Sequence, residues 1–258
     1  MRYGVLADIH GNLRALQMAV QTLDSAGVDR YIVAGDLVGY GPEPNECVEL
    51  VAGLDAICIA GNHDLIAIGR MSADRCIVLA QHSLSWTSSV LTNRSRMFLG
   101  ALPLQARTDD GVVVAHGSLD DPEEYTTRPA TARDQLARIS AEISGARVLI
   151  LGHTHRPWAF SRSGTLSTRA DVGLPEDAIH LNPGSVGQSR ELRARARCLL
   201  LRLDEGKATF LALRYDLAGC QAALRDLGLS SRSCHLRPSL PAAGARATRL
   251  MVRRLSSR

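Results

Sequence analysis

Five short polar blocks in this sequence carry side chain types that bind metal ions. Each block follows a short apolar run, and together the blocks supply aspartate, asparagine and histidine but no cysteine. Carboxylate, amide oxygen and imidazole without thiolate favour divalent ions such as Mn, Fe, Ni or Zn. The blocks are Asp8-Ile9-His10, Gly35-Asp36, Gly61-Asn62-His63-Asp64, His116-Gly117 and Gly152-His153-Thr154-His155.

Each block has an ordinary explanation when it is taken alone. Asp-x-His is common by chance, Asp or Asn beside a glycine suits a turn, and a lone histidine is usually a core residue. The blocks nevertheless stand at equivalent positions, just beyond five expected strands, and open α/β sheets bind ligands at the carboxyl ends of their strands. Their coincidence predicts a metal site. Seven candidate ligands suit two divalent ions about 3.5 to 4 Å apart that share one carboxylate: Asp8, His10, Asp36, Asn62, His116, His153 and His155.

A repeated alternation of strand and helix positions these blocks. Apolar runs that end in polar or glycine clusters, each usually followed by a helical stretch, are typical of a mostly parallel sheet. We expect strands over 3–7, 30–34, 56–60, 112–115 and 147–151. We expect helices over 13–26, 43–52, 74–91 and 131–143.

The pattern changes after Pro157, where antiparallel strands are expected. These strands lie over 158–162, 178–182, 197–203 and 207–213. A last helix is expected over 216–227, ending at Gly228. We expect residues 1–228 to form one domain and 229–258 to form a basic, mobile tail, because the latter segment shows little periodicity.

The charge of the chain is concentrated in that tail. The formal net charge of the 258 residues is +4, and Lys207 is the single lysine among the 30 basic residues, which excludes a phosphate-binding loop that requires lysine. Seven arginines and no acidic residue follow Asp226, so residues 1–226 carry a net charge of −3.

Cysteine usage and hydropathy predict a cytoplasmic protein without a membrane anchor or signal peptide. The six cysteines include no Cys-x-x-Cys pair, and Cys58 and Cys198 lie within apolar runs, which favours reduced core cysteines. No apolar run approaches the roughly 18 residues of a membrane helix.

The five blocks, in this order, resemble the pattern of the calcineurin-like metallophosphoesterases over about residues 1–215. Two further segments are typical of the small prokaryotic phosphodiesterase-type members, Gly-Asp-Leu-Val-Gly-Tyr-Gly-Pro over 35–42 and Asn-Pro-Gly-Ser-Val-Gly over 182–187. The resemblance implies the α/β fold of that family, a four-layer α/β/β/α sandwich of two mixed β-sheets flanked by helices, with the metals at one sheet edge.

The resemblance also implies a role for each residue. One metal would be bound by Asp8, His10 and His155, and the other by Asn62, His116 and His153, with Asp36 bridging both. His63 would donate a proton to the leaving oxygen or stabilise charge, and Asp64 would orient His63. The implied reaction is in-line attack of a metal-bridging hydroxide on phosphorus, with manganese as the ion expected to be most active in vitro.

The substrate class is left open by the sequence. A nucleotide or small phosphodiester is expected, and the alternatives are a serine/threonine protein phosphatase and a dinucleoside polyphosphate hydrolase. A nuclease that binds nucleic acid through the arginine-rich tail is a weaker alternative. The sequence does not indicate the oligomeric state.

Several further residues have two interpretations. Tyr40 and Arg128 are possible substrate contacts, but a packed tyrosine and a solvated arginine are the more ordinary interpretation. The segment 182–187 could present backbone amides to an anion or form a plain turn. The segment 190–197, rich in arginine, departs from the family pattern; it could contact a second phosphate or nucleic acid, although a solvated face is favoured. His82 and His180 are expected to be structural.

Overall fold

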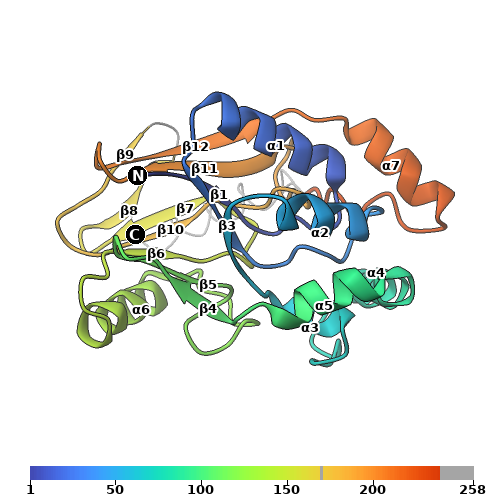
Figure 1. Ribbon diagram of the computed structural model, residues 1–258, viewed down its shortest axis with the longest axis horizontal. Coiled ribbons are helices and arrows are strands. Elements are labelled where there is room, and N and C mark those ends of the chain that lie inside the picture. Colours follow the sequence, from blue (N-terminus) through green and yellow to red (C-terminus); the bar gives the residue numbers. More distant parts are fainter. Residues whose placement is uncertain (169–170, 239–258) are drawn as a thin grey trace, which may run out of the picture.

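Two six-stranded sheets stacked face to face, with helices outside both, form four layers (Figure 1). The structure is a computed structural model that describes residues 1–168 and 171–238. Helices α1 and α2 pack on the outer face of the first sheet, and α6 packs on that of the second. The expected α/β/β/α sandwich is confirmed.

The first sheet has the strand order β3-β2-β1-β11-β12-β9. Its first three strands are parallel, and β1 pairs with β11 in antiparallel orientation, which makes the sheet mixed. The strands are β1 (Arg2–Leu6), β2 (Arg30–Ala34), β3 (Ala56–Ile59), β9 (Val172–Gly173), β11 (Ala196–Arg202) and β12 (Lys207–Leu213).

The second sheet has the strand order β4-β5-β6-β10-β7-β8. Strands β5, β6 and β10 are parallel, and the outer strands pair in antiparallel orientation. The strands are β4 (Gln105–Arg107), β5 (Val112–Ala115), β6 (Val148–Ile150), β7 (Trp158–Ser161), β8 (Gly164–Leu166) and β10 (Ile179–Asn182). The sequence patterns did not indicate β4, β8 or β9, which are only two or three residues long.

The helices differ from expectation mainly at their beginnings. The helix expected from residue 74 begins at Val78, and α6 begins at Pro129 because proline suits the first position of a helix. Helices α3 and α5 were not anticipated. The helices are α1 (Leu13–Ser25), α2 (Pro44–Ala52), α3 (Asn62–Ala67), α4 (Val78–Val90), α5 (Asn93–Ala101), α6 (Pro129–Glu142) and α7 (Leu217–Asp226). Within the described ranges, no helix has the length and apolarity to cross a bilayer.

The interior between the sheets is aliphatic. Val5, Ile32, Val114, Ile150 and Leu181 belong to one buried cluster contributed by five strands of the two sheets. Separate apolar clusters lie under the helices on the outer faces. Because both faces of the central strands are covered, the strand ends are left as the place where polar side chains gather.

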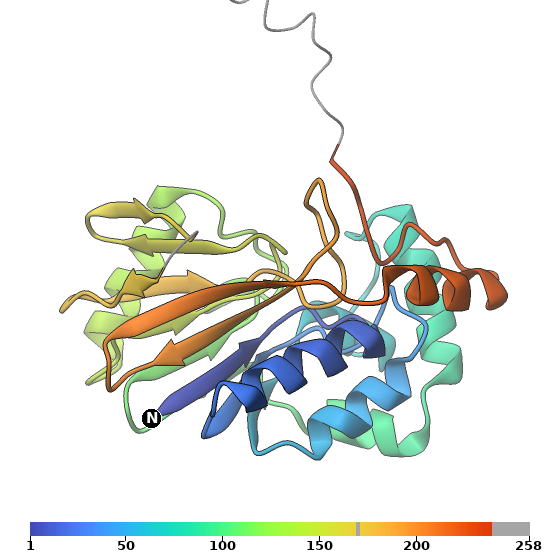
Figure 2. The same cartoon turned by 90° about the horizontal axis from the view of Figure 1, so that it is seen from above.

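The segment 229–238 lies against the body of the protein. Leu229 and Cys234 are buried against Cys220 and Leu224 of α7, and the backbone of Ser189 exchanges hydrogen bonds with this segment. Figure 2 shows the segment beside the loop that joins β10 to β11. Part of the expected mobile tail therefore packs against the body, residues 239–258 lie outside the described part, and the domain boundary at 228 stays a prediction.

Candidate active site

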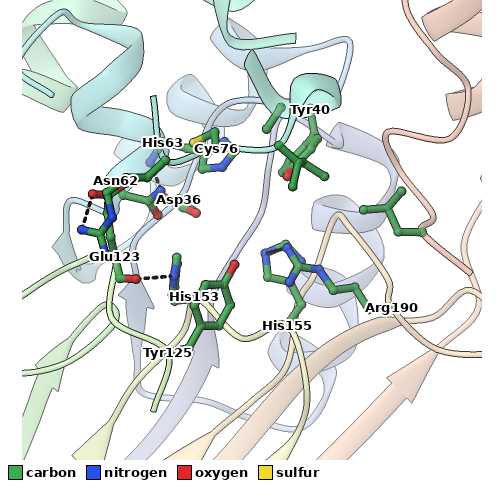
Figure 3. Close-up of a pocket in the computed structure, with 14 residues that line it drawn as sticks. Asp36, Tyr40, Asn62, His63, Cys76, Glu123, Tyr125, His153, His155 and Arg190 are labelled. Atoms are coloured by element: carbon green, nitrogen blue, oxygen red, sulfur yellow. Dashed lines mark hydrogen bonds and ion pairs between the residues drawn. The ribbon is translucent and has the colours of Figure 1, made fainter. Parts of the chain in front are cut away.

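The polar blocks meet where β1, β2, β5 and β6 end. Hydrogen bonds join successive blocks beyond the strands, from His10 N to the carbonyl oxygen of Asp36 (2.9 Å) and from Gly152 N to that of His116 (2.9 Å). All nine predicted site residues are buried there. They surround or underlie a cavity of about 360 Å³, into which Asp36, His63 and His153 point (Figure 3).

The backbone at this edge adopts an unusual conformation. Within the described residues, positive φ angles of 50° to 64° occur at six residues that are not glycine. Such angles cost of order 1 to 3 kcal/mol each and cluster at functional sites. Five of the six are predicted metal ligands, and the sixth lines the cavity: Asp8, His10, Asp36, His153, His155 and Tyr40. These left-handed turns direct consecutive polar side chains toward a common region instead of continuing each strand.

The side chains form overlapping groups that could each hold an ion. Within each group, the candidate ligand atoms lie within 4.8 Å of one another. Asp36 Oδ2 is 3.6 Å from His10 Nε2 and 3.2 Å from His116 Nε2, so this carboxylate lies between two groups. The groups are Asp8 with His10 and His155, Asp36 with His116 and His153, and His10 with Asp36 and His63.

Backbone carbonyls orient the candidate imidazole ligands. The Nδ1 atoms of His10, His116 and His155 lie 3.1, 2.7 and 2.9 Å from the carbonyl oxygens of Val38, Ala34 and Gln188. His153 is turned the other way, with Nε2 3.2 Å from the carbonyl oxygen of Glu123. A carbonyl only accepts, so when a ring is neutral its second nitrogen keeps a free lone pair, as in metal-ligating histidines.

Buried atoms at this edge lack the partners that burial normally requires. Among the described residues, Asp8 Oδ2, Asn62 Oδ1 and His116 Nε2 are inaccessible to solvent and make no hydrogen bond. Leaving such atoms unpaired costs about 1 to 3 kcal/mol each. Because all three are ligand atoms of the kinds that divalent ions bind, the residues fit metal ions at this place.

Burial sets the protonation of the candidate ligands. It lowers the pKa of His10 and His155 well below the usual value, so both rings are neutral and able to bind a cation. Burial acts to raise the pKa of Asp36, but the neighbouring His116 and His63 outweigh it and hold this pKa well below its usual range. Burial raises the pKa of Asp8 to about 7. A nearby cation would favour ionised Asp8.

Comparison with protein families identifies the chain. Residues 1–206 match the model of the calcineurin-like phosphoesterase superfamily domain. The chain belongs to the calcineurin-like phosphoesterases. It is therefore a hydrolase of phosphoester bonds in a metal-dependent family, which agrees with the expectation from the five blocks.

Three proteins illustrate what this phosphoesterase is similar to. A metallophosphoesterase from Sphaerobacter thermophilus superposes with a TM-score of 0.79 and 31% identity, covering 91% of this chain and 96% of that one. The uncharacterized protein MJ0912 of Methanocaldococcus jannaschii is 31% identical over 83% of this chain and 87% of its own. The phosphodiesterase YfcE of Escherichia coli is 24% identical over 72% of this chain and 79% of its own.

His63 lines the cavity, and Asp64 contacts the backbone instead of the ring of His63. His63 lines the cavity, stacks on Tyr40 with ring centroids 4.8 Å apart, and has a buried Nδ1 without a hydrogen-bond partner in the described ranges. Within the described residues, no hydrogen bond joins Asp64 to this ring. Its Oδ1 accepts from the backbone N–H groups of Leu37 and Val38 (2.8 and 3.1 Å), and its Oδ2 accepts from Gly61 N (2.9 Å). Asp64 thus holds the loop that carries Asp36.

The segment 182–187 is hydrogen-bonded to the backbone that carries Asp8. Val186 N donates to the carbonyl oxygen of Ala7 (3.0 Å), and Gly187 N donates to that of Asp8 (3.0 Å). The amide of Gly184 donates to Asn182 Oδ1 (2.9 Å). These N–H groups are used within the protein, so they do not form the anion cradle that was one of the two interpretations.

Tyr40, Tyr125 and Arg190 are among the residues that line the cavity of the phosphoesterase. Tyr40 does so, as one of its two interpretations anticipated, whereas Arg128 is exposed at the start of α6 and lines neither this cavity nor its neighbour. Arg190 is half-buried with its guanidinium 3.4 Å from His155 Nε2, although a solvated face was favoured for it. Sequence reasoning missed Tyr125, whose ring centroid is 4.2 Å from that of His153. No local pattern distinguishes Tyr125 from a surface tyrosine.

Proposed function

We propose that this phosphoesterase uses two divalent metal ions to hydrolyse a small phosphodiester, with nucleotides as the preferred class. The observation that carries the proposal is the position of Asp36, whose Oδ2 lies 3.6 Å from one candidate ligand group at His10 and 3.2 Å from the other at His116. A carboxylate between two sets of neutral or unpaired ligand atoms suits a bridging ligand.

The ligands divide between the two ions in the manner that the family pattern implies. Bound there, two divalent ions would lower the pKa of water and offset the charge of the phosphoryl oxygens. Asp36 would contact both ions. The first ion would be held by Asp8, His10 and His155, and the second by Asn62, His116 and His153. We also propose that manganese supports the highest activity in vitro.

Two further residues of the site, Asp64 and His63, have roles other than metal binding. Asp64 keeps the Asp36 loop in place through its three backbone hydrogen bonds. His63 is fixed by stacking on Tyr40, and its backbone N–H donates to Asp36 Oδ1 (2.8 Å). We assign to His63 the donation of a proton to the leaving oxygen or the stabilisation of its charge, since its ring borders the cavity.

One relative, YfcE, is named a phosphodiesterase, and this favours a phosphodiester over other esters as the substrate. The cavity is also small, about 360 Å³ beside the candidate ligands, which suits a small molecule. Free cysteines at all six positions support a reducing compartment, and we propose the cytoplasm.

Metal analysis joined to a substrate panel tests this function. The protein is stripped of metal, reloaded separately with Mn, Ni, Zn or Fe, and assayed on bis-p-nitrophenyl phosphate and p-nitrophenyl phosphate. We expect two ions per chain and faster turnover of the diester. A stoichiometry of one ion would contradict the two-metal site. Preferred cleavage of a phosphopeptide or a dinucleoside polyphosphate would reassign the substrate class.

A further inference from the structure

A second cavity adjoins the candidate metal site and has no role in the function proposed so far. Its volume is about 420 Å³, and its walls include Arg156 and Trp158. Tyr125 and Arg190 line this cavity and the metal-site cavity alike. Figure 3 shows these two side chains beside His153 and His155, at the lower side of the metal-site cavity. We call this second space the flanking cavity.

An aromatic wall of the flanking cavity is held in place by contacts behind it. Trp158 donates from its indole nitrogen to Thr165 Oγ1 (3.3 Å). Its ring also meets His180 edge to face, with centroids 5.1 Å apart. Tyr125, which is 52% exposed, packs on the ring of His153. A fixed aromatic ring beside an open cavity favours stacking with a planar ligand group.

The same cavity carries positive charge without a nearby counterion. In the parts of the chain that the structure describes, no carboxylate oxygen lies within 4.0 Å of the guanidinium of Arg156 or Arg190. Arg190 is positioned by Gln188, whose Oε1 accepts from Arg190 Nε (3.0 Å). Arginines that are not neutralised bind phosphate groups well, through paired N–H donors.

We propose that the flanking cavity binds the leaving portion of the substrate, and that this portion is a nucleoside phosphate. Its base would lie on Trp158, and its own phosphate would lie between Arg156 and Arg190. The proposal rests on the phosphodiester hydrolysis proposed above. Water would add to the phosphorus next to the metals, the bond from phosphorus to the leaving oxygen would break, and the protonated leaving portion would remain in the flanking cavity.

A single-tryptophan variant tests this assignment by a measurement that does not depend on turnover. The chain has two tryptophans, and Trp86 lies away from both cavities, against the cluster around Cys220. In the manganese-loaded Trp86→Phe variant, titration with ADP should quench the fluorescence of Trp158. Adding Arg156→Ala should weaken ADP binding about 10-fold or more, because a hydrogen bond to a charged group contributes about 1.5 to 3 kcal/mol.

A matched arginine provides the control. Arg128 is exposed on the neighbouring segment but lines neither cavity, so Arg128→Ala should leave ADP binding unchanged. The same order of affinities should appear as inhibition constants of ADP in the chain that retains both tryptophans. The flanking-cavity assignment is overturned if ADP inhibits without quenching Trp158, if ADP does not bind, or if Arg156→Ala and Arg128→Ala bind it equally. Failure to hydrolyse bis-p-nitrophenyl phosphate would instead overturn the proposed function.

Discussion

Two buried regions of this molecule contribute to stability in opposite directions. Between the sheets, residues such as Ile32 and Leu181 are fully enclosed by other aliphatic side chains. At the strand ends, Asp8 and His116 are equally buried, but each keeps an unpaired polar atom, and Asp8 adopts a left-handed conformation. The first region contributes stability through apolar burial. The second region lowers the stability of the fold. We expect a ligand such as a metal ion to offset this loss by binding the unpaired atoms.

A buried histidine outside the site sharpens this contrast. His180 on β10 is enclosed and, in the described part of the chain, neither of its ring nitrogens makes a hydrogen bond. His116 is also enclosed, but its Nδ1 is held by a carbonyl oxygen and its Nε2 faces Asp36. Burial alone therefore does not mark a ligand. The distinguishing feature is one nitrogen fixed by the backbone and the other directed at a carboxylate.

The largest effect is expected from Asp36→Asn. If this carboxylate serves two ions, its loss removes several kcal/mol of transition-state stabilisation, which corresponds to a fall in kcat of at least about 100-fold at saturating Mn. The fall in kcat is measured with bis-p-nitrophenyl phosphate, together with the metal content of the variant. The exposed Asp109→Asn is the control. Near-normal turnover would show that the strand-end carboxylate does not bridge two ions.

His63→Ala should separate chemistry from metal binding at that same edge. We expect both ions to remain and the turnover of diesters with poor leaving groups to fall about 100-fold, because a general acid contributes at least that factor. Diesters of p-nitrophenol should be affected less. The exposed His82→Ala on α4 is the matched control. Loss of metal would instead make His63 a ligand, in agreement with its group with His10 and Asp36.

His180→Phe should reduce the pH dependence of stability. Burial lowers the pKa of His180 to about 3, below the value near 6.5 of the unfolded chain, so the unfolded state binds the proton first. The contribution of a neutral His180 is complete above pH 6.5 and is lost as the pH falls toward 3. Between pH 7 and 5 this loss is about 2 kcal/mol. In urea unfolding, the fall in the free energy of unfolding between these pH values should be about 2 kcal/mol smaller in the variant than in the parent, whereas His82→Phe should keep the parental pH dependence.

The smallest effect is expected from Ile32→Val in the aliphatic interior. Removing one buried methylene should lower the free energy of unfolding by about 0.5 to 1.5 kcal/mol. Metal content and kcat should stay at the parental level, because the side chain lies between the sheets and not at the strand ends. A loss of metal in this variant would mean that the two regions are coupled and that the contrast between them is too simple.

The sequence predicted well those features that local patterns encode. Strand runs such as residues 30–34 and the blocks that follow them indicated both the layers and the residues at the shared edge. It did not indicate the contacts of Asp64, because a carboxylate next to His63 in the chain accepts from the backbone of Leu37 and Val38 in space. It also did not determine the contacts of the segment 182–187, in which the amides of Val186 and Gly187 donate to carbonyl oxygens just beyond β1, about 180 residues earlier.

By itself, the sequence determined the kinds of atoms available for chemistry and their order along the strands, because ligand types and β/α periodicity are properties of short segments. Only the tertiary structure decided which nitrogen of each histidine is free, that Asp36 lies between two ligand groups, and that Tyr125 and Arg190 join the metal-site cavity to the flanking cavity. These features depend on contacts between segments far apart in the chain. Packing of the two sheets creates those contacts.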